Sequence, residues 1–200
     1  MSLSNIVRLK THLSGSDDAL LQQLLDEVEA GVKMFLRGRR LDSHEIVNEY
    51  HDGSGRPTLI LKQRPVTAVT EVRVDANGQS GQSATGFGSG TVWTQGDGWF
   101  ARSLKEDESN PGELIAGGGW PEGIGNIRVT YTAGYSTVPA DVQMAVHMLV
   151  ARIRADHDKG RPVASETLGS YSYSLLTGKD EGSEMASARA VLMKYRSIAI

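Results

Sequence analysis

The segment from Val129 to Ile153 constrains the fold more than any other part of the sequence. Apolar residues alternate up to Tyr131, as in a strand with one buried face, and the alternation stops at Gly134-Tyr135. Pro139 then suits the first turn of a helix that continues to about Asp158. This helix carries two apolar stripes, one of Val142, Val146, Leu149 and Ile153, and a second of Met144, Met148 and Ala151.

A helix on the surface of a monomer needs only one apolar stripe, so the two stripes are predicted to have different neighbours. The first should face the protein's own core, packed on an earlier helix between Leu21 and Leu36. The second, Met144, Met148 and Ala151, should face another subunit, because contiguous exposed apolar surface usually marks an interface and methionine adapts to irregular contacts. The alternative is a helix that its own chain encloses completely.

Two further helices are predicted beside this central one, which covers residues 139–159. The first covers residues 14–38, where Ser14 or Ser16 can cap its start and Gly38 suits its end. Its apolar residues recur at three- and four-residue steps: Leu21, Leu24, Leu25, Val28, Val32, Phe35 and Leu36. The last covers residues 183–196, with Met185, Ala188, Leu192 and Tyr195 on one face.

Residues 45–133 form a β-rich section with frequent turn dipeptides and alternating apolar residues. Strands are predicted at 46–50, 58–62, 69–74 and 127–132, and weaker ones at 91–94, 99–103 and 113–116. The fold class is therefore predicted as α+β. Residues 1–200 form a single domain in which a helical core (N-terminal, long central and C-terminal helices) carries a β-rich insertion of antiparallel strands.

The sequence contains no motif typical of an enzyme or a metal site. It has no cysteine, its five histidines match no metal-binding spacing, and the glycine-rich stretches 86–90 and 117–119 are not followed by a helix. We therefore expect no catalytic, cofactor-binding or metal-binding residues. Trp93, Trp99 and Trp120 could bind a ligand, but packing within the β-rich section is the favoured interpretation.

The charge pattern argues against an open nucleic-acid surface. The formal net charge is −3, whereas proteins that hold phosphates usually carry a basic surplus. The short cluster Arg37, Arg39 and Arg40 is interpreted as complementing a helix C-terminus. No apolar run approaches the roughly 20 residues that span a bilayer, and no signal-peptide pattern is present, so a soluble cytoplasmic protein is expected.

Two segments are predicted to become ordered only against a partner. Residues 78–90 are mostly small and polar and offer little apolar surface to offset the entropy of ordering, about 1–2 kcal/mol per residue. Residues 163–175 are similar in composition but include Tyr171 and Tyr173, which we expect to contact a partner.

Four segments together resemble a known family. They are the leucine-rich helix ending near Phe35-Leu36, the stretch "EYHDGSGRPTLILKQRPVTAVTEVRVD" (49–75), the stretch "IRVTYTAGYSTVPADVQMAVHMLVARI" (127–153), and the Gly169–Ser172 loop before a helix that ends in Lys194-Tyr195-Arg196. The Thr-Ala-Gly-Tyr and Val-Pro-Ala-Asp elements are the most specific. The chain resembles the head-to-tail connector (adaptor) proteins of tailed bacteriophages, which form the ring beneath the portal. It departs from the family pattern between residues 78 and 125.

The resemblance implies a structural virion protein without a cofactor. Its partners would be other copies of itself, in a ring of typically twelve, the portal protein, and the next neck or tail component. DNA would pass through the ring without sequence-specific binding. The protein would lie at the head-to-tail junction after assembly in the host cytoplasm. The alternatives are another neck or tail-completion protein, or a small hydrolase or carbohydrate-binding module built on the β-rich section.

Overall fold

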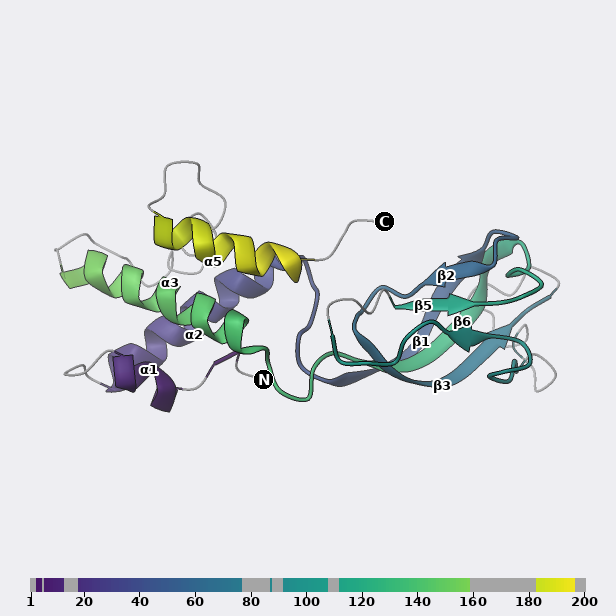
Figure 1. Cartoon of the computed structure of the whole chain (residues 1–200), viewed down its shortest axis with the longest axis horizontal. Coiled ribbons are helices and arrows are strands. Elements are labelled where there is room, and N and C mark those ends of the chain that lie inside the picture. Colours follow the sequence, from purple (N-terminus) through teal and green to yellow (C-terminus); the bar gives the residue numbers. More distant parts are fainter. Residues whose placement is uncertain are drawn as a thin grey trace. The chain divides into compact units, whose positions relative to one another are not determined.

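The computed structural model describes residues 3–4, 6–12, 18–76, 87, 92–107, 112–158 and 183–196 (Figure 1). The chain divides into two compact units. We call residues 1–42 together with 137–200 the helical unit, and residues 43–136 the β unit. The single domain over residues 1–200 stays a prediction.

The helical unit contains α1 (Ile6–His12), α2 (Asp18–Phe35), α3 (Ala140–Asp158) and α5 (Ser183–Lys194). Helix α3 packs against both α2 and α5. Every apolar residue predicted to share one face of α2 is buried, and so are the four predicted for α5. The three-and-four spacing therefore located these two faces correctly. The short helix α1, with seven residues, is too short to show such a repeat and was not predicted.

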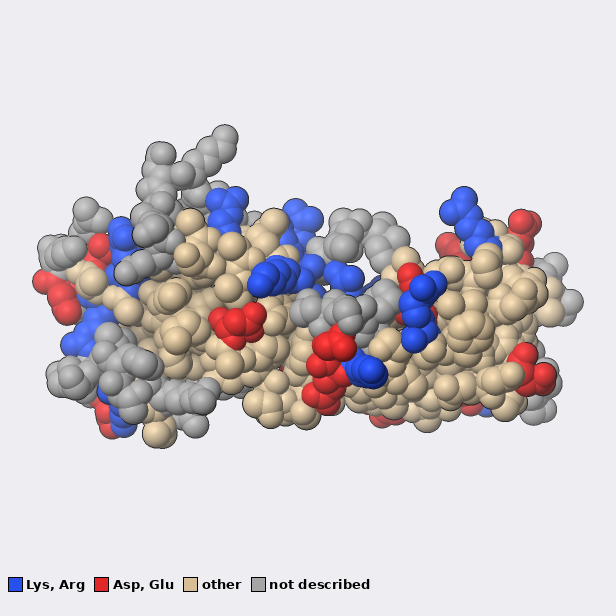
Figure 2. Space-filling view, viewed as in Figure 1, with Lys and Arg blue, Asp and Glu red and all other residues tan. Residues whose placement is uncertain are grey.

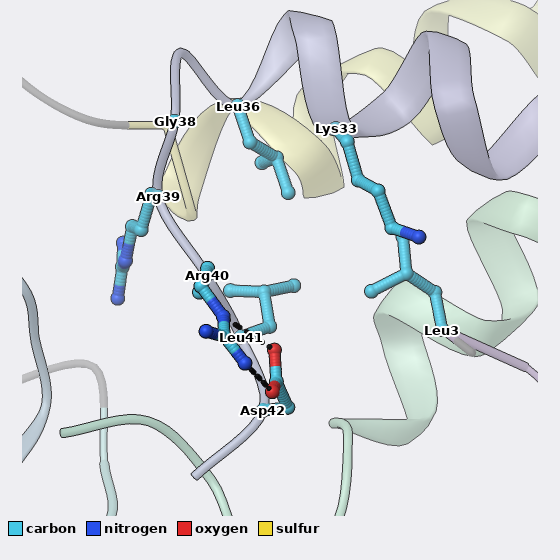
Figure 3. A pocket seen from close by; sticks show the side chains of 8 residues that line it. All are labelled: Leu3, Lys33, Leu36, Gly38, Arg39, Arg40, Leu41 and Asp42. Carbon is cyan, nitrogen blue, oxygen red and sulfur yellow. Dashed lines mark hydrogen bonds and ion pairs between the residues drawn. The ribbon is translucent and has the colours of Figure 1, made fainter. Parts of the chain in front are cut away.

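Helix α2 ends three residues before the predicted limit at residue 38. Its last residue is Phe35, and a turn follows over residues 36–38. Gly38 adopts a positive φ of 76°, the left-handed conformation that glycine reaches without strain. The chain therefore leaves the helix sharply, and residues 39–42 lie beside the helix end rather than continuing it (Figure 3).

The described residues of the β unit form two antiparallel three-stranded sheets. The first has the order β1 (His44–Gly53), β6 (Gly123–Ala133), β3 (Val66–Val74). The second has the order β2 (Thr58–Ile60), β5 (Glu113–Ile115), β4 (Phe100–Ala101). Helices together with antiparallel sheets agree with the predicted α+β class. The predicted strand at 91–94 reduces to an isolated bridge between Val92 and Arg73.

One apolar cluster joins the two sheets of the β unit. It includes Leu59 and Leu114 from the second sheet, and Val72, Val129 and Tyr131 from the first. The pattern of a single strand does not reveal such a shared core, because the residues that meet in it lie far apart in sequence. Within the described part of the chain, no helix is long and apolar enough to cross a membrane.

Candidate functional site

Helix α3 presents its two predicted stripes to different surroundings. Val142, Val146, Leu149 and Ile153 are each 0% exposed, so this stripe belongs to the core of the helical unit. On the second stripe, Met144 is 48% exposed, whereas Met148 and Ala151 are half-buried. The outer stripe of α3, defined as Met144, Met148 and Ala151, thus remains partly open in the protomer.

The outer stripe is held in place by the rest of the helical unit. Ala145 and Val150, which lie between the two stripes, are also buried, because α3 packs against both α2 and α5. Near its N-terminus, the Asp141 carboxylate accepts a hydrogen bond from the Tyr195 hydroxyl, with O–O distances of 2.8 and 3.0 Å. A helix fixed on two sides offers its remaining side as a rigid surface.

A buried polar contact, which sequence analysis missed, secures the N-terminal segment on this scaffold. Glu29 is only 4% exposed, and its Oε1 accepts hydrogen bonds from the backbone N–H groups of Leu3 at 2.6 Å and Ser4 at 3.0 Å. The Ser4 hydroxyl also lies 2.5 Å from Nε2 of His147 on α3. A glutamate within the apolar stripe of α2 was the only signal in the sequence for this anchor.

A pocket of about 300 Å³ lies at the C-terminal end of α2. Figure 3 shows Lys33 and Leu3 on one side of it, the stretch from Arg39 to Asp42 on the other, and Leu36 between them. The leucines that line it, Leu3, Leu36 and Leu41, are almost fully buried. The cationic head groups of Lys33 and Arg40 reach solvent, since these side chains are 54% and 57% exposed.

Two residues of the predicted arginine cluster, Arg39 and Arg40, line this pocket. Arg40 pairs with Asp42, and the Arg39 guanidinium lies 5.9 Å from the ring centroid of Tyr195. The Arg196 guanidinium lies 5.0 Å from the ring centroid of Phe35, which brings a cation from beyond α5 to the end of α2. Figure 2 shows Lys and Arg side chains over this part of the helical unit, near the end of α5.

The β unit contains a buried polar cluster around Glu49. Its carboxylate lies 2.6 Å from Nε2 of His51 and accepts hydrogen bonds from the Tyr131 hydroxyl at 2.8 Å and the Lys62 backbone at 3.1 Å. Burial alone would raise the pKa of Glu49, but these hydrogen bonds outweigh it and hold the pKa below its usual value. Burial, followed by the Glu49 charge, raises the pKa of Tyr131 above its usual range.

A β-bulge places Glu49 in this position. Ile46 pairs with Tyr131 and Glu49 pairs with Val129, so one extra residue enters β1 between them. Asn48 has a positive φ of 57° within the bulge. Simple alternation predicts that Ile46 and Glu49 face opposite sides, whereas the bulge turns both toward the same side. The cluster joins β1, β6 and the Lys62–Gln63 turn, and so has a structural role.

The tryptophans pack within the β unit, as the favoured interpretation predicted. Trp99 and Trp120 are 4% and 1% exposed. Trp93 stacks on Trp120 with ring centroids 5.5 Å apart, and its carbonyl accepts a hydrogen bond from Nε1 of Trp99 at 3.0 Å. These rings therefore form no open platform for a sugar or another ligand. Among the side chains that the structure describes, no group of three or more His, Asp or Glu is placed to hold a metal ion.

Some predicted residues lie outside the described part of the chain. Tyr171 and Tyr173 do, and so does the 78–90 segment except Phe87. Phe87 is 5% exposed, packs edge-on against Tyr50 with ring centroids 5.9 Å apart, and lies under the Arg128 guanidinium. The predicted partner-dependent ordering of these two segments stays a prediction.

A protein-family model described as "Head completion protein" matches residues 4–198. The chain belongs to this family. This membership confirms the predicted relationship to head-to-tail connectors and the predicted structural role of this head completion protein.

The fold of this head completion protein is also found in a solved structure. A chain of "Neck of empty GTA particle computed with C6 symmetry" superposes with a TM-score of 0.52 at 20% sequence identity. The match covers 98% of this chain and 90% of that chain, so both units take part in the likeness. No curated protein matches the sequence significantly.

Proposed function

We propose that this head completion protein forms a closed ring, a dodecamer in the virion, that joins the portal to the next neck or tail component. The observation that carries the proposal is the outer stripe of α3, which the protomer leaves partly open. Apolar surface at the rigid centre of a helical scaffold is suited to contact with another subunit. The neck assignment of the structurally similar chain supports the same location.

A ring requires two different patches on each protomer, because a head-to-tail contact joins unlike surfaces. The outer stripe of α3 supplies one of them. In this proposal the helical unit forms the core of the ring, with α3 between α2 and α5, and the β unit is an insertion between α2 and α3. Tyr171 and Tyr173 would contact the portal or the next neck component.

The same ring would continue the DNA channel without gripping DNA. The formal net charge is −3, which is compatible with a tunnel through which phosphates slide. The protein would be assembled in the host cytoplasm, lie at the head-to-tail junction of the virion, and require neither a cofactor nor a catalytic residue. A different neck or tail-completion protein is the alternative that an assembly experiment separates from this proposal.

The test is negative-stain imaging and mass measurement of the purified protein, alone and mixed with the portal ring of the same phage. We expect a ring that is coaxial with the portal and has a mass corresponding to twelve copies. A free protein that stays monomeric is consistent with the proposal if the portal templates the ring. A protein that neither forms a ring alone nor binds the portal would overturn the proposal.

A further inference from the structure

The most exposed large apolar side chain among the described residues is Ile124, at 79%. It lies at the tip of the long β1–β6 pair, where Gly53 pairs with Gly123. Two carboxylates flank it: Glu122 two residues earlier, and Asp52, whose Oδ1 accepts a hydrogen bond from Gly125 N at 2.6 Å. The nearby turn carries one cation, Arg56. We call Ile124 with Asp52 and Glu122 the acidic tip.

The pocket at the end of α2 has the complementary character. Leucine side chains line it, and its cationic lining residues are Lys33 and Arg40, which are exposed, and Arg39, which is only 4% exposed; Asp42 is the single acidic lining residue. Its volume of about 300 Å³ is at the lower end of the range for small-molecule sites, roughly 300–1,000 Å³. An apolar side chain flanked by carboxylates matches both the lining and the charge of such a pocket.

We infer that the acidic tip of one copy inserts Ile124 into the α2 pocket of a second copy. The inference rests on the proposed ring and supplies its second, heterologous contact beside the outer stripe of α3. The tip is at the opposite end of β1 and β6 from His44 and Ala133, where the chain enters and leaves the β unit. Ten residues of β1 span roughly 30 Å, so within the β unit the tip lies far from these two ends.

A protein segment suits this pocket better than nucleic acid does. The pocket is concave and its floor is made of leucines, which offer nothing to a phosphate backbone. Asp42 pairs with Arg40, and Glu29 lies 3.6 Å from Lys33, so the rim of the pocket carries only a small positive surplus, which is little for a polyanion such as nucleic acid. The charges therefore favour a contact with few carboxylates and one apolar anchor.

Cross-linking tests the contact directly, because the wild-type sequence has no cysteine. One preparation carries Ile124→Cys and the other carries Lys33→Cys, and the two are mixed during assembly on the portal and treated with a short bismaleimide. We expect a dimer joined through positions 124 and 33, identified by peptide mass spectrometry. Only a contact between copies can produce it. Val47→Cys, at a 61% exposed position of β1, replaces Ile124→Cys in the control and should give no such dimer.

A second measurement uses self-association. Ile124→Asp should weaken it by about tenfold or more, since the leucine floor of the pocket offers a carboxylate no hydrogen bond and desolvating it there costs more than about 1.4 kcal/mol. Val47→Asp, an equivalent change at another exposed position, should change it less than threefold. Rings that form normally with Ile124→Asp and yield no 124–33 link would overturn this inference and leave the ring proposal intact.

The remaining outcomes separate the two proposals. A 124–33 link between copies that never close into rings would support the contact and overturn the ring. Neither a link nor assembly would overturn both. Loss of portal binding by Ile124→Asp without a link between copies would show that the tip contacts the portal instead, and would overturn the inference. The inference would also be overturned if the wild type bound DNA, Lys33→Glu abolished that binding, and no 124–33 link formed.

Discussion

The helical unit and the β unit are stabilised in different ways. In the helical unit, apolar side chains at helical spacing meet across α2, α3 and α5, and these residues are almost completely buried. In the β unit, the core includes the large rings of Trp99, Trp120 and Tyr131, and a buried carboxylate, Glu49, ties two strands to a turn. The stability of the helical unit therefore depends on many similar apolar contacts, and that of the β unit depends on a few large or polar side chains.

This difference predicts that single substitutions act locally and unequally. All three tryptophans belong to the β unit, whereas the described helices belong to the helical unit. Tryptophan fluorescence therefore reports unfolding of the β unit, and far-UV circular dichroism at helical wavelengths reports mainly the helical unit. Using both signals on one sample distinguishes the two cores.

The largest effect is expected from Trp120→Ala in the β unit. Trp120 is 1% exposed and stacks on Trp93, so its removal leaves a large cavity and an unstacked ring. We expect the free energy of unfolding to fall by about 3–5 kcal/mol in denaturant titrations followed by the remaining tryptophans. The helical signal should keep its midpoint. Equal shifts of both signals would mean that the two units unfold as the single domain predicted from sequence.

Leu149→Ala is the corresponding change in the helical unit. Leu149 is 0% exposed on the inner stripe of α3, and the substitution should cost about 2–5 kcal/mol. Here the helical signal should shift and the fluorescence midpoint should not. Met193→Ala, at a methionine of α5 that is 47% exposed, is the control in the same unit and should change stability by less than about 0.5 kcal/mol.

The helical faces could be predicted from sequence because each depends on residues close together in the chain. Leu21 to Leu36 and Met185 to Tyr195 repeat every three or four residues, and a repeat of this kind has one structural solution. The outer stripe of α3 was predicted as a set of residues, but its partial burial depends on how α2 and α5 cover the helix. That information is not local.

In the β unit, a single extra residue can reverse which side of the sheet the following side chains face, contrary to simple alternation. The bulge at Asn48 turns Glu49 inward, and no periodicity in the sequence marks its position. The α2 pocket and the acidic tip were missed for a related reason. The pocket combines Leu3 with residues 33–42, which the N-terminal anchor on Glu29 brings together.

Glu49→Gln should have an intermediate effect, confined to the β unit. It replaces a buried carboxylate that accepts several hydrogen bonds and should cost about 1–3 kcal/mol at pH 7. The control is Glu45→Gln, at an exposed position of the same strand. Fluorescence-detected unfolding measures both.

The same variant should also change how stability depends on pH. Because the folded protein lowers the pKa of Glu49, its contribution is complete above the usual value of about 4.3 and is lost as the pH falls through the lower folded-state pKa. As the pH falls from about 5 to about 2, the free energy of unfolding of the wild type should therefore decrease more than that of Glu49→Gln. Parallel curves for the two proteins would show that the carboxylate charge contributes nothing.

The smallest effect on stability, and the largest on assembly, is expected at the outer stripe of α3. Met144 is 48% exposed, so Met144→Asp should change the melting of the protomer little. In a ring it would place an unpaired carboxylate in a desolvated contact, which is costly. Met193→Asp is closely matched, because Met193 is 47% exposed on α5 and lies outside the stripe.

The most direct test of the account measures ring yield on the portal, by sedimentation and imaging, for wild type, Met144→Asp and Met193→Asp, with the thermal melt of each protomer. We expect the free energies of unfolding of the three protomers to agree within about 0.5 kcal/mol. Met144→Asp alone should lose the ring. If Met144→Asp assembles as well as Met193→Asp does, the outer stripe of α3 is not a subunit interface and the central claim is wrong.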